Sequence, residues 1–191
     1  MTEQQSTRAQ NKQSRHQAIL EALATQLEKH PGQRITTAQL AESLGVSEAA
    51  LYRHFPSKAR MFEGLIEFSE DTVFGLIRRI VDEDDNAVSR CEKIMALMLG
   101  FSAKNPGISS VLVGTALTGE TERLRHRVSQ FFDRLETQFR QILRERELTL
   151  TQAGGRPVNE TANLLLSIVQ SPLQGWEQQW QLINTILKVY A

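Results

Sequence analysis

The sequence of 191 residues has few of the residues that mark a disulfide-rich, zinc-stapled or membrane protein. Its only cysteine, Cys91, cannot form an intramolecular disulfide or supply a multi-cysteine zinc site. Its longest apolar run, Ile94–Phe101, is far shorter than the roughly 20 residues that span a bilayer. The first residues are polar and lack the apolar segment of a secretory signal. These absences predict a cytoplasmic protein without a membrane anchor.

Charge of one sign is not in excess, since 22 basic residues balance 22 acidic ones, but the charges are unevenly distributed. Up to Arg60 the chain holds eight basic and five acidic residues, a net charge of plus three, and the remainder carries minus three. A basic N-terminal part on an acidic body fits an end that faces phosphates. Two solvated surfaces of unequal charge explain the difference equally well.

Alternating apolar and polar residues, the mark of a strand, are absent over any length, and no internal repeat is present. The sequence instead predicts an all-α fold, with a polar mobile arm at 1–13, a break at 105–107 and a loop at 154–157. In the first part of the chain, helices are expected at 14–30, from a cap at Thr36 or Thr37 to residue 44, at 48–54, and from 58 to the acidic cluster at 82–85. In the second part, they are expected at 88–104, from about 120 onward as one long helix, at 159–170 and at 176–189.

Two short helices between Thr36 and His54 have the mechanical features of a helix-turn-helix. Each is too short to bury itself, so the apolar residues must pack inward against the first helix. These residues are Leu40, Ala41, Leu44, Val46 and Leu51. Gly45 stands where the turn needs a positive φ, and Ser47 can cap the next helix.

This packing leaves one face of the helix 48–54 free to enter a DNA major groove. The predicted DNA-contacting residues are Thr36, Thr37, Ser47, Glu48, Ala49, Tyr52, Arg53, His54 and Lys58. Small side chains at Ser47 and Ala49 permit close approach to bases, whereas Thr37, the Tyr52 hydroxyl, His54 and Lys58 suit phosphates. Tyr52 and Phe55 could instead be core aromatics, and Lys58 an ordinary solvated lysine.

Residues 35–41 (ITTAQLA) and 45–58 (GVSEAALYRHFPSK) resemble the DNA-binding domain of the TetR family. The resemblance covers about the first third of the chain. It implies an all-α homodimer of about nine helices per subunit that binds palindromic double-stranded DNA. The later helices would form the dimer interface and, in most members, a small-molecule pocket. The implied domains are the arm (1–13), the helix-turn-helix domain (14–57) and a helical dimerisation and partner-binding domain (58–191).

A narrower resemblance points to the nucleoid occlusion factors within this family, which bind chromosomal sites and inhibit the division protein FtsZ. It rests on residues 47–62, 65–68, 70–71, 99–101 and 105–107. The implied partner-binding positions are Phe68, Leu97, Gly100, Lys104 and Asn105. Lys104 departs from the arginine expected there, which keeps the charge but not the planar fork. The implied location is the nucleoid.

Other interpretations remain open. Phe68, Leu97 and Gly100 could simply be core residues, and the protein could be a repressor that responds to a small molecule. Catalysis is not expected, because Cys91 has no histidine near it in sequence and the four histidines lack ligand spacing. No glycine-rich phosphate loop is present. The sequence therefore predicts no enzyme, metal or cofactor.

Overall fold

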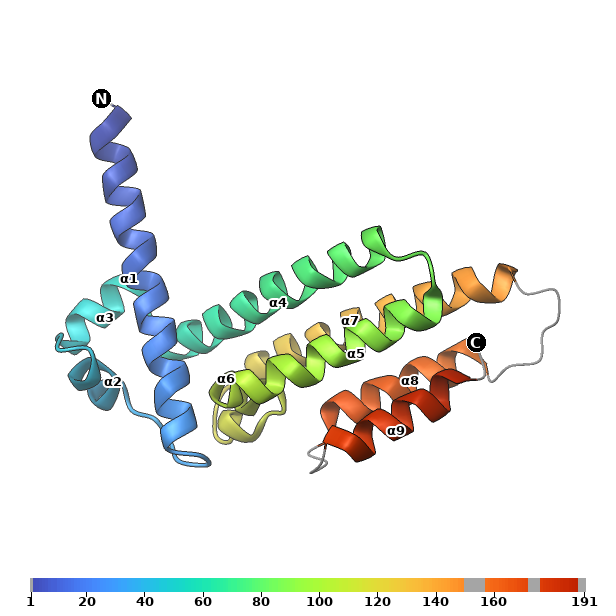
Figure 1. The fold of residues 1–191 in the computed structure, drawn as a ribbon. Coiled ribbons are helices and arrows are strands. Elements are labelled where there is room, and N and C mark those ends of the chain that lie inside the picture. Colours follow the sequence, from blue (N-terminus) through green and yellow to red (C-terminus); the bar gives the residue numbers. More distant parts are fainter. Residues whose placement is uncertain (1, 150–156, 172–175, 189–191) are drawn as a thin grey trace. The chain divides into compact units, whose positions relative to one another are not determined.

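The computed structural model describes residues 2–149, 157–171 and 176–188 of the chain. In these ranges the protein consists of α-helices and one short 3-10 helix, without a strand, which confirms the predicted all-α fold (Figure 1). The elements are α1 (Thr2–Lys29), α2 (Thr37–Ser43), α3 (Glu48–His54), α4 (Lys58–Glu83), α5 (Ala87–Lys104), α6 (Pro106–Leu112), η1 (Thr115–Leu117), α7 (Glu122–Thr149), α8 (Val158–Gln170) and α9 (Trp176–Leu187). The predicted loop at 154–157, except for Pro157, and the predicted helix end at 189 lie outside the described residues.

The elements form two compact units. The first unit comprises residues 1–69 and 105–128, and the second comprises residues 70–104 and 129–191. The long helices α4 and α7 each contribute residues to both. The domain boundaries predicted at 13/14 and 57/58 stay predictions.

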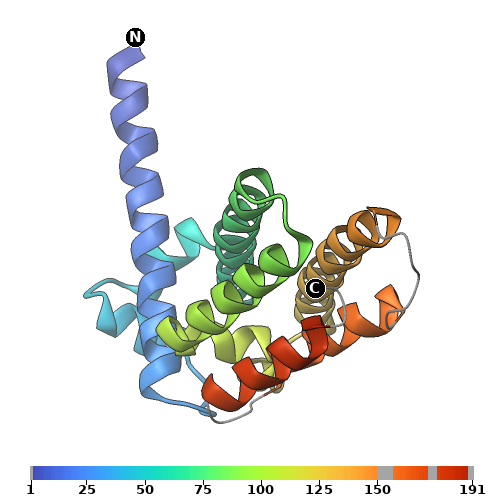
Figure 2. The ribbon, with the colours of Figure 1, turned by 45° about the vertical axis from the view of Figure 1, so that its right-hand side comes forward.

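The first helix is longer than the sequence predicted. It begins at Thr2, twelve residues before the expected start at Ser14. The expected start followed the apolar periodicity, which begins near Ala18. However, the preceding Gln, Lys, Arg and Ala residues have good helix propensity, so they extend a helix that packing has already nucleated. In both views the beginning of α1 extends past α2 and α3 (Figures 1 and 2).

The core of the first unit lies where α1 packs against α2 and α3. Leu23 of α1, Leu40 of α2 and Leu51 of α3 are all buried. α6 also packs closely on α1. At this crossing a Cβ atom on Gly107 would lie 2.0 Å from the backbone oxygen of Ala24. Only glycine fits this approach without a shift of one helix, because the obstructing atom belongs to the backbone.

The segment after α5 corrects the sequence prediction. Asn105–Gly107 ends α5 as predicted, but it also begins a new helix, α6, which the sequence did not predict. Pro106 occupies the first helical position, where its missing N–H costs nothing and its fixed φ favours the helix. The sequence pattern had indicated only a helix break at this proline.

In the second unit, α8 packs beside α9, and α5 contacts both. α5 supplies much of the core, because Cys91, Ile94 and Met95 are fully buried. The next turn, Met98 and Leu99, is also buried. Among the described residues of this unit, four large apolar side chains remain exposed: Leu76 on α4, Leu148 on α7, Leu164 on α8 and Leu182 on α9.

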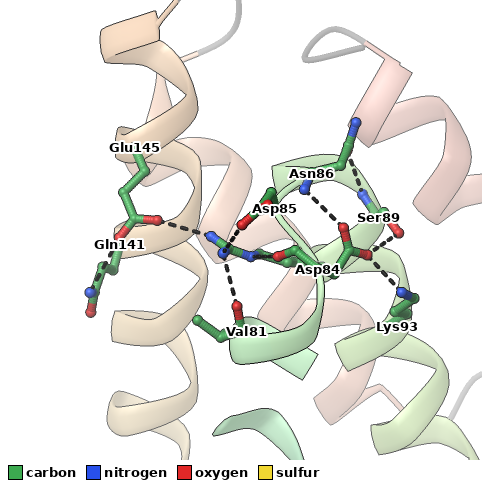
Figure 3. Close-up of polar contacts among 9 residues, drawn as sticks. Val81, Asp84, Asp85, Asn86, Ser89, Lys93, Gln141 and Glu145 are labelled. Carbon is green, nitrogen blue, oxygen red and sulfur yellow. Dashed lines mark hydrogen bonds and ion pairs between the residues drawn. The ribbon is translucent and has the colours of Figure 1, made fainter. Parts of the chain in front are cut away.

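The corner between α4 and α5 is held by the carboxylate of Asp84 (Figure 3). It accepts hydrogen bonds from the backbone N–H of Asn86 at 2.8 Å, the Ser89 hydroxyl at 2.5 Å and the Lys93 ammonium at 2.7 Å. These donors favour the charged form, so the pKa of Asp84 lies far below its ordinary value, with the Lys93 hydrogen bond as the largest cause. The acidic cluster therefore ends α4 at Glu83, close to the predicted position.

Arg90 closes the same corner from the other side. Its guanidinium donates to the backbone oxygens of Asp84 and Val81 and forms an ion pair with Glu145 of α7 at 3.1 Å. The arginine thus satisfies carbonyl groups at the end of α4 that have no intrahelical partner. It also joins α4 to α7 within the second unit.

Candidate DNA-binding site

The helix-turn-helix is defined by local caps that the sequence predicted. Thr36 caps α2 with a reciprocal capping box, in which Thr36 Oγ1 accepts from the Gln39 N–H at 3.2 Å and Gln39 Oε1 accepts from the Thr36 N–H at 3.0 Å. Gly45 turns the chain with φ +62°. Ser47 caps α3 by accepting from the Ala50 N–H at 3.3 Å. The bounds of α3 are those predicted.

The outward face of α3 is exposed. Ser47, Glu48, Ala49, Tyr52 and Arg53 all lie on the surface, whereas Leu51 on the opposite side has no exposed area. Tyr52 is 43% exposed, so the alternative that it is a core aromatic is wrong. Phe55 is 4% exposed and is a core residue.

A polar contact joins the beginning of α2 to this face. The Thr37 hydroxyl donates to Glu48 Oε2 at 2.5 Å and accepts from the Tyr52 hydroxyl at 3.4 Å. Glu48 stands in the first turn of α3, where a negative charge is favourable. The three side chains therefore restrain one another across the turn, and three of the predicted DNA-contacting residues lie together.

His54, at the end of α3, lies beside α1. Its ring is 6.5 Å from that of His16, which stacks on Phe55 at 3.8 Å and has its Nε2 3.3 Å from the His54 carbonyl oxygen. Nothing in the described part of the chain bonds to the buried Nδ1 of His54. Partial burial lowers the pKa of His54 below 6.5, and the positive charges of His16, Arg15, Lys12 and Arg53 lower it further.

Lys58 is the first residue of α4. The alternative that it is an ordinary solvated lysine is wrong. Its ammonium donates to Glu120 Oε1 at 2.6 Å, and the two side chains are only 20% and 14% exposed. The same ammonium lies 5.4 Å from the centre of the Phe62 ring. Glu120 was not among the predicted site residues, because no spacing rule links residues that are 62 positions apart.

The predicted partner-binding residues lie on three helices. Leu97, Gly100 and Lys104 belong to α5, where the first two are half-buried and Lys104 is exposed. Phe68 of α4 is half-buried, and Asn105 is the N-cap of α6. Phe68 and Asn105 belong to the first unit, and the other three to the second. None of the five is fully buried.

Other kinds of site find little support in the described ranges. They hold no group of three or more His, Cys, Asp or Glu side chains that could bind a metal ion. Cys91 is fully buried, and desolvation raises the pKa of its thiol to about 12, which leaves it a poor nucleophile. None of the described helices combines the length and apolar character needed to cross a membrane.

The capped, exposed α3 on an all-α scaffold defines a helix-turn-helix protein. Residues 19–65 match the model of the tetR family of bacterial regulatory proteins, and residues 85–188 match the SlmA-like form of the tetracyclin repressor-like C-terminal domain. The chain belongs to the tetR family and, within it, to the SlmA group of nucleoid occlusion factors. This confirms the resemblance seen in the sequence and the expectation of a regulator in place of an enzyme.

Two relatives illustrate the membership in this group. The nucleoid occlusion factor SlmA of Marinomonas sp. (strain MWYL1) is 49% identical over 185 residues, covering 90% of this chain and 94% of its own. The nucleoid occlusion factor SlmA of Alteromonas mediterranea is 53% identical over 168 residues, covering 88% of this chain and 86% of its own.

Solved structures share the fold at lower identity. The TetR family regulator PfmR of Thermus thermophilus has a TM-score of 0.69 and 21% identity, covering 89% of this chain and 97% of its own. AibR, solved with isovaleryl coenzyme A and operator DNA, has a TM-score of 0.71 and 15% identity, covering 90% of this chain and 97% of its own. These likenesses concern the fold alone.

Proposed function

We propose that this protein is a nucleoid occlusion factor, which binds palindromic chromosomal DNA as a homodimer and, while bound, inhibits FtsZ assembly. The observation that carries the DNA part is the exposed face of α3, which two caps and the Thr37–Glu48–Tyr52 contact hold in place. The protein would act in the cytoplasm, associated with the nucleoid. Near half identity to SlmA proteins over most of the chain supports the division role.

On the DNA side, the proposed contacts divide into two kinds. Ser47, Glu48, Ala49 and Arg53 face base edges in the major groove, where small or polar side chains permit direct readout. The phosphate contacts are assigned to Thr36, Thr37, Tyr52, His54 and Lys58. Phosphate contacts position the protein, whereas base contacts select the sequence.

On the FtsZ side, the proposal centres on α5. Leu97, Gly100 and Lys104 are spaced three and four residues apart, so they share one face of this helix. A Cβ atom at Gly100 would meet no atom within 4 Å, which leaves space for the backbone of a bound peptide. Lys104, exposed in the last turn, would attract an acidic segment of the partner. Phe68 and Asn105 belong to the first unit, so they stay predicted positions, and the proposal rests on the three residues of α5.

The test is a pair of substitutions on α5, Lys104→Glu and Gly100→Trp, assayed for DNA binding and for sedimentation with FtsZ polymers in the presence of DNA. DNA binding should persist, since both residues lie outside the helix-turn-helix. FtsZ binding should fall at least about tenfold, because a reversed charge and a filled space each oppose the bound segment. Arg144→Glu, a charge reversal at an exposed site on α7, serves as the control.

The outcome separates the proposal from its rival. If both variants retain FtsZ binding, the division role loses its proposed site, and a repressor that responds to a small molecule becomes the better interpretation. Native mass spectrometry of the purified protein would then reveal a bound ligand.

A further inference from the structure

The ion pair between Lys58 and Glu120 lies within the first unit, at the beginning of α4 and next to the helix-turn-helix. The two side chains are shielded from solvent, and Phe62 lies under the ammonium. Water therefore screens this pair less than it screens an exposed salt bridge. A phosphate that approaches Lys58 must share its ammonium with Glu120 or displace the carboxylate.

Glu120 is held in place by its own surroundings. Its N–H donates to the backbone oxygen of Leu117 at 3.0 Å, and Leu117 is almost fully buried. Gly119, with φ +78°, makes the turn that precedes it. The backbone of Glu120 is therefore held in a turn that hydrogen-bonds back to a buried residue.

A second contact, one turn further along α4, keeps the two segments together. Glu63 accepts from Arg123 of α7 at 2.8 Å and from Arg60 at 2.7 Å. The polarity is reversed relative to the first pair, because here α4 supplies the anion and α7 the cation. The beginning of α4 is thus joined at two points to residues 120–123, and Glu120 stays within reach of Lys58.

We propose that Glu120 is a positioning residue that competes with DNA phosphate for Lys58 and so sets the affinity of the protein for DNA of any sequence. This inference rests on the proposed phosphate contact of Lys58. It follows because Glu120 already neutralises the ammonium before DNA arrives. Since phosphate contacts carry no sequence information, weakening one of them lowers binding to all sequences alike.

Competition of Glu120 for Lys58 and simple repulsion between Glu120 and DNA phosphate predict different changes in DNA affinity. Repulsion alone would make the loss of the Glu120 charge equally favourable whether or not Lys58 is present. Competition adds a second gain that requires Lys58, because the freed ammonium can bind phosphate fully. The difference between the two gains is the coupling that a double-mutant cycle measures.

The experiment compares four full-length proteins: the wild type, Glu120→Gln, Lys58→Met and the double variant. Methionine keeps an unbranched apolar chain over Phe62 while removing the charge. Binding to a fluorescent duplex of arbitrary sequence is measured by anisotropy between about 50 and 200 mM salt. Glu122→Gln, an equal charge change at an exposed site two residues away, is the control.

We expect Glu120→Gln to bind the duplex about three- to tenfold more tightly and to steepen the salt dependence by up to about one unit. In the Lys58→Met background the same change should have a clearly smaller effect, and Glu122→Gln should change affinity less than about twofold. Equal gains in both backgrounds, no gain, or weaker binding by Glu120→Gln would each overturn the proposal. Glu120→Ala repeats the test if the glutamine variant unfolds at a lower temperature than the wild type.

Duplex binding by the wild type shows whether the proposed function or only the role of Glu120 fails. If it binds no duplex even at low salt, the DNA contacts and the role of Glu120 fail together. If it binds but is insensitive to Glu120, only the role of Glu120 fails.

Discussion

A Cβ atom at Gly107 of α6 would lie 2.0 Å from the carbonyl oxygen of Ala24 on α1. We therefore expect Gly107→Ala to force the two helices apart and to lower the free energy of unfolding by about 2 kcal/mol or more. Urea unfolding followed by circular dichroism measures this loss. Gly75→Ala is the matched control, because its Cβ would meet no atom within 4 Å and alanine favours the helix by up to about 1 kcal/mol. A variant at residue 107 as stable as the wild type would disprove the close crossing.

The second prediction concerns sequence selection by Ala49, which is exposed on α3. Replacing it with glutamine should change the DNA sequences that the protein enriches from a random pool, because the longer amide can reach base edges. Binding to arbitrary duplexes should change little, since the phosphate contacts remain. An unchanged sequence preference would mean that residue 49 does not face the bases.

The third prediction concerns the pH dependence of DNA binding. In the DNA-free protein, burial and neighbouring cations lower the pKa of His54 below 6.5. A bound phosphate would favour the charged ring and raise this pKa, so binding would take up a proton. Affinity should therefore increase as the pH falls from about 7.5 toward the lowered pKa. His54→Gln should flatten this dependence, and a slope that persists would assign it to another group.

The fourth prediction concerns acid stability. The folded protein holds the pKa of Asp84 below 3.8, so the carboxylate contributes stability that is present above the unfolded pKa and lost as the pH falls below it. Asp84→Asn should make the protein less stable at neutral pH and should reduce the loss of stability below about pH 4. Urea midpoints across this range measure both effects. Asp85→Asn is the control, because Asp85 is fully exposed and lies 3.8 Å from Arg90.

The fifth prediction concerns the proposed homodimer. Leu164 and Leu182 expose apolar surface on α8 and α9, which pack side by side and are among the later helices expected to form the dimer interface. An aspartate at either position should weaken dimerisation at least tenfold, as measured by light scattering at low micromolar concentration. Leu76→Asp on α4, with similar exposure, should leave the mass unchanged. A monomeric wild type would refute the dimer outright.

The helix-turn-helix could be predicted from the sequence because its determinants are local. Thr36, Gly45 and Ser47 each act on the three or four residues beside them, so their roles can be inferred from the sequence alone. The exposed face of α3 could be predicted in the same way, because the apolar residues that pack inward leave the opposite side of the helix at the surface. Which of these side chains contact DNA stays a prediction.

The parts that could not be predicted depend on contacts between distant segments. Nothing near Lys58 in sequence indicates Glu120, and nothing near Gly107 indicates Ala24. The early start of α1 was missed for a different reason, since a polar segment shows no periodicity even when its residues favour the helix. α6 was missed because proline is as compatible with a helix start as with a break.

Because Cys91 is buried, we expect the native protein to react only slowly with thiol reagents. With no exposed area and a thiol pKa of about 12, the side chain can react only when α5 opens, so its alkylation rate reports that opening directly. Because the sequence holds no other cysteine, a cysteine introduced on the surface would be the single labelled site in an otherwise unaltered chain. A fluorophore attached there could follow one subunit on DNA without any prior removal of native thiols.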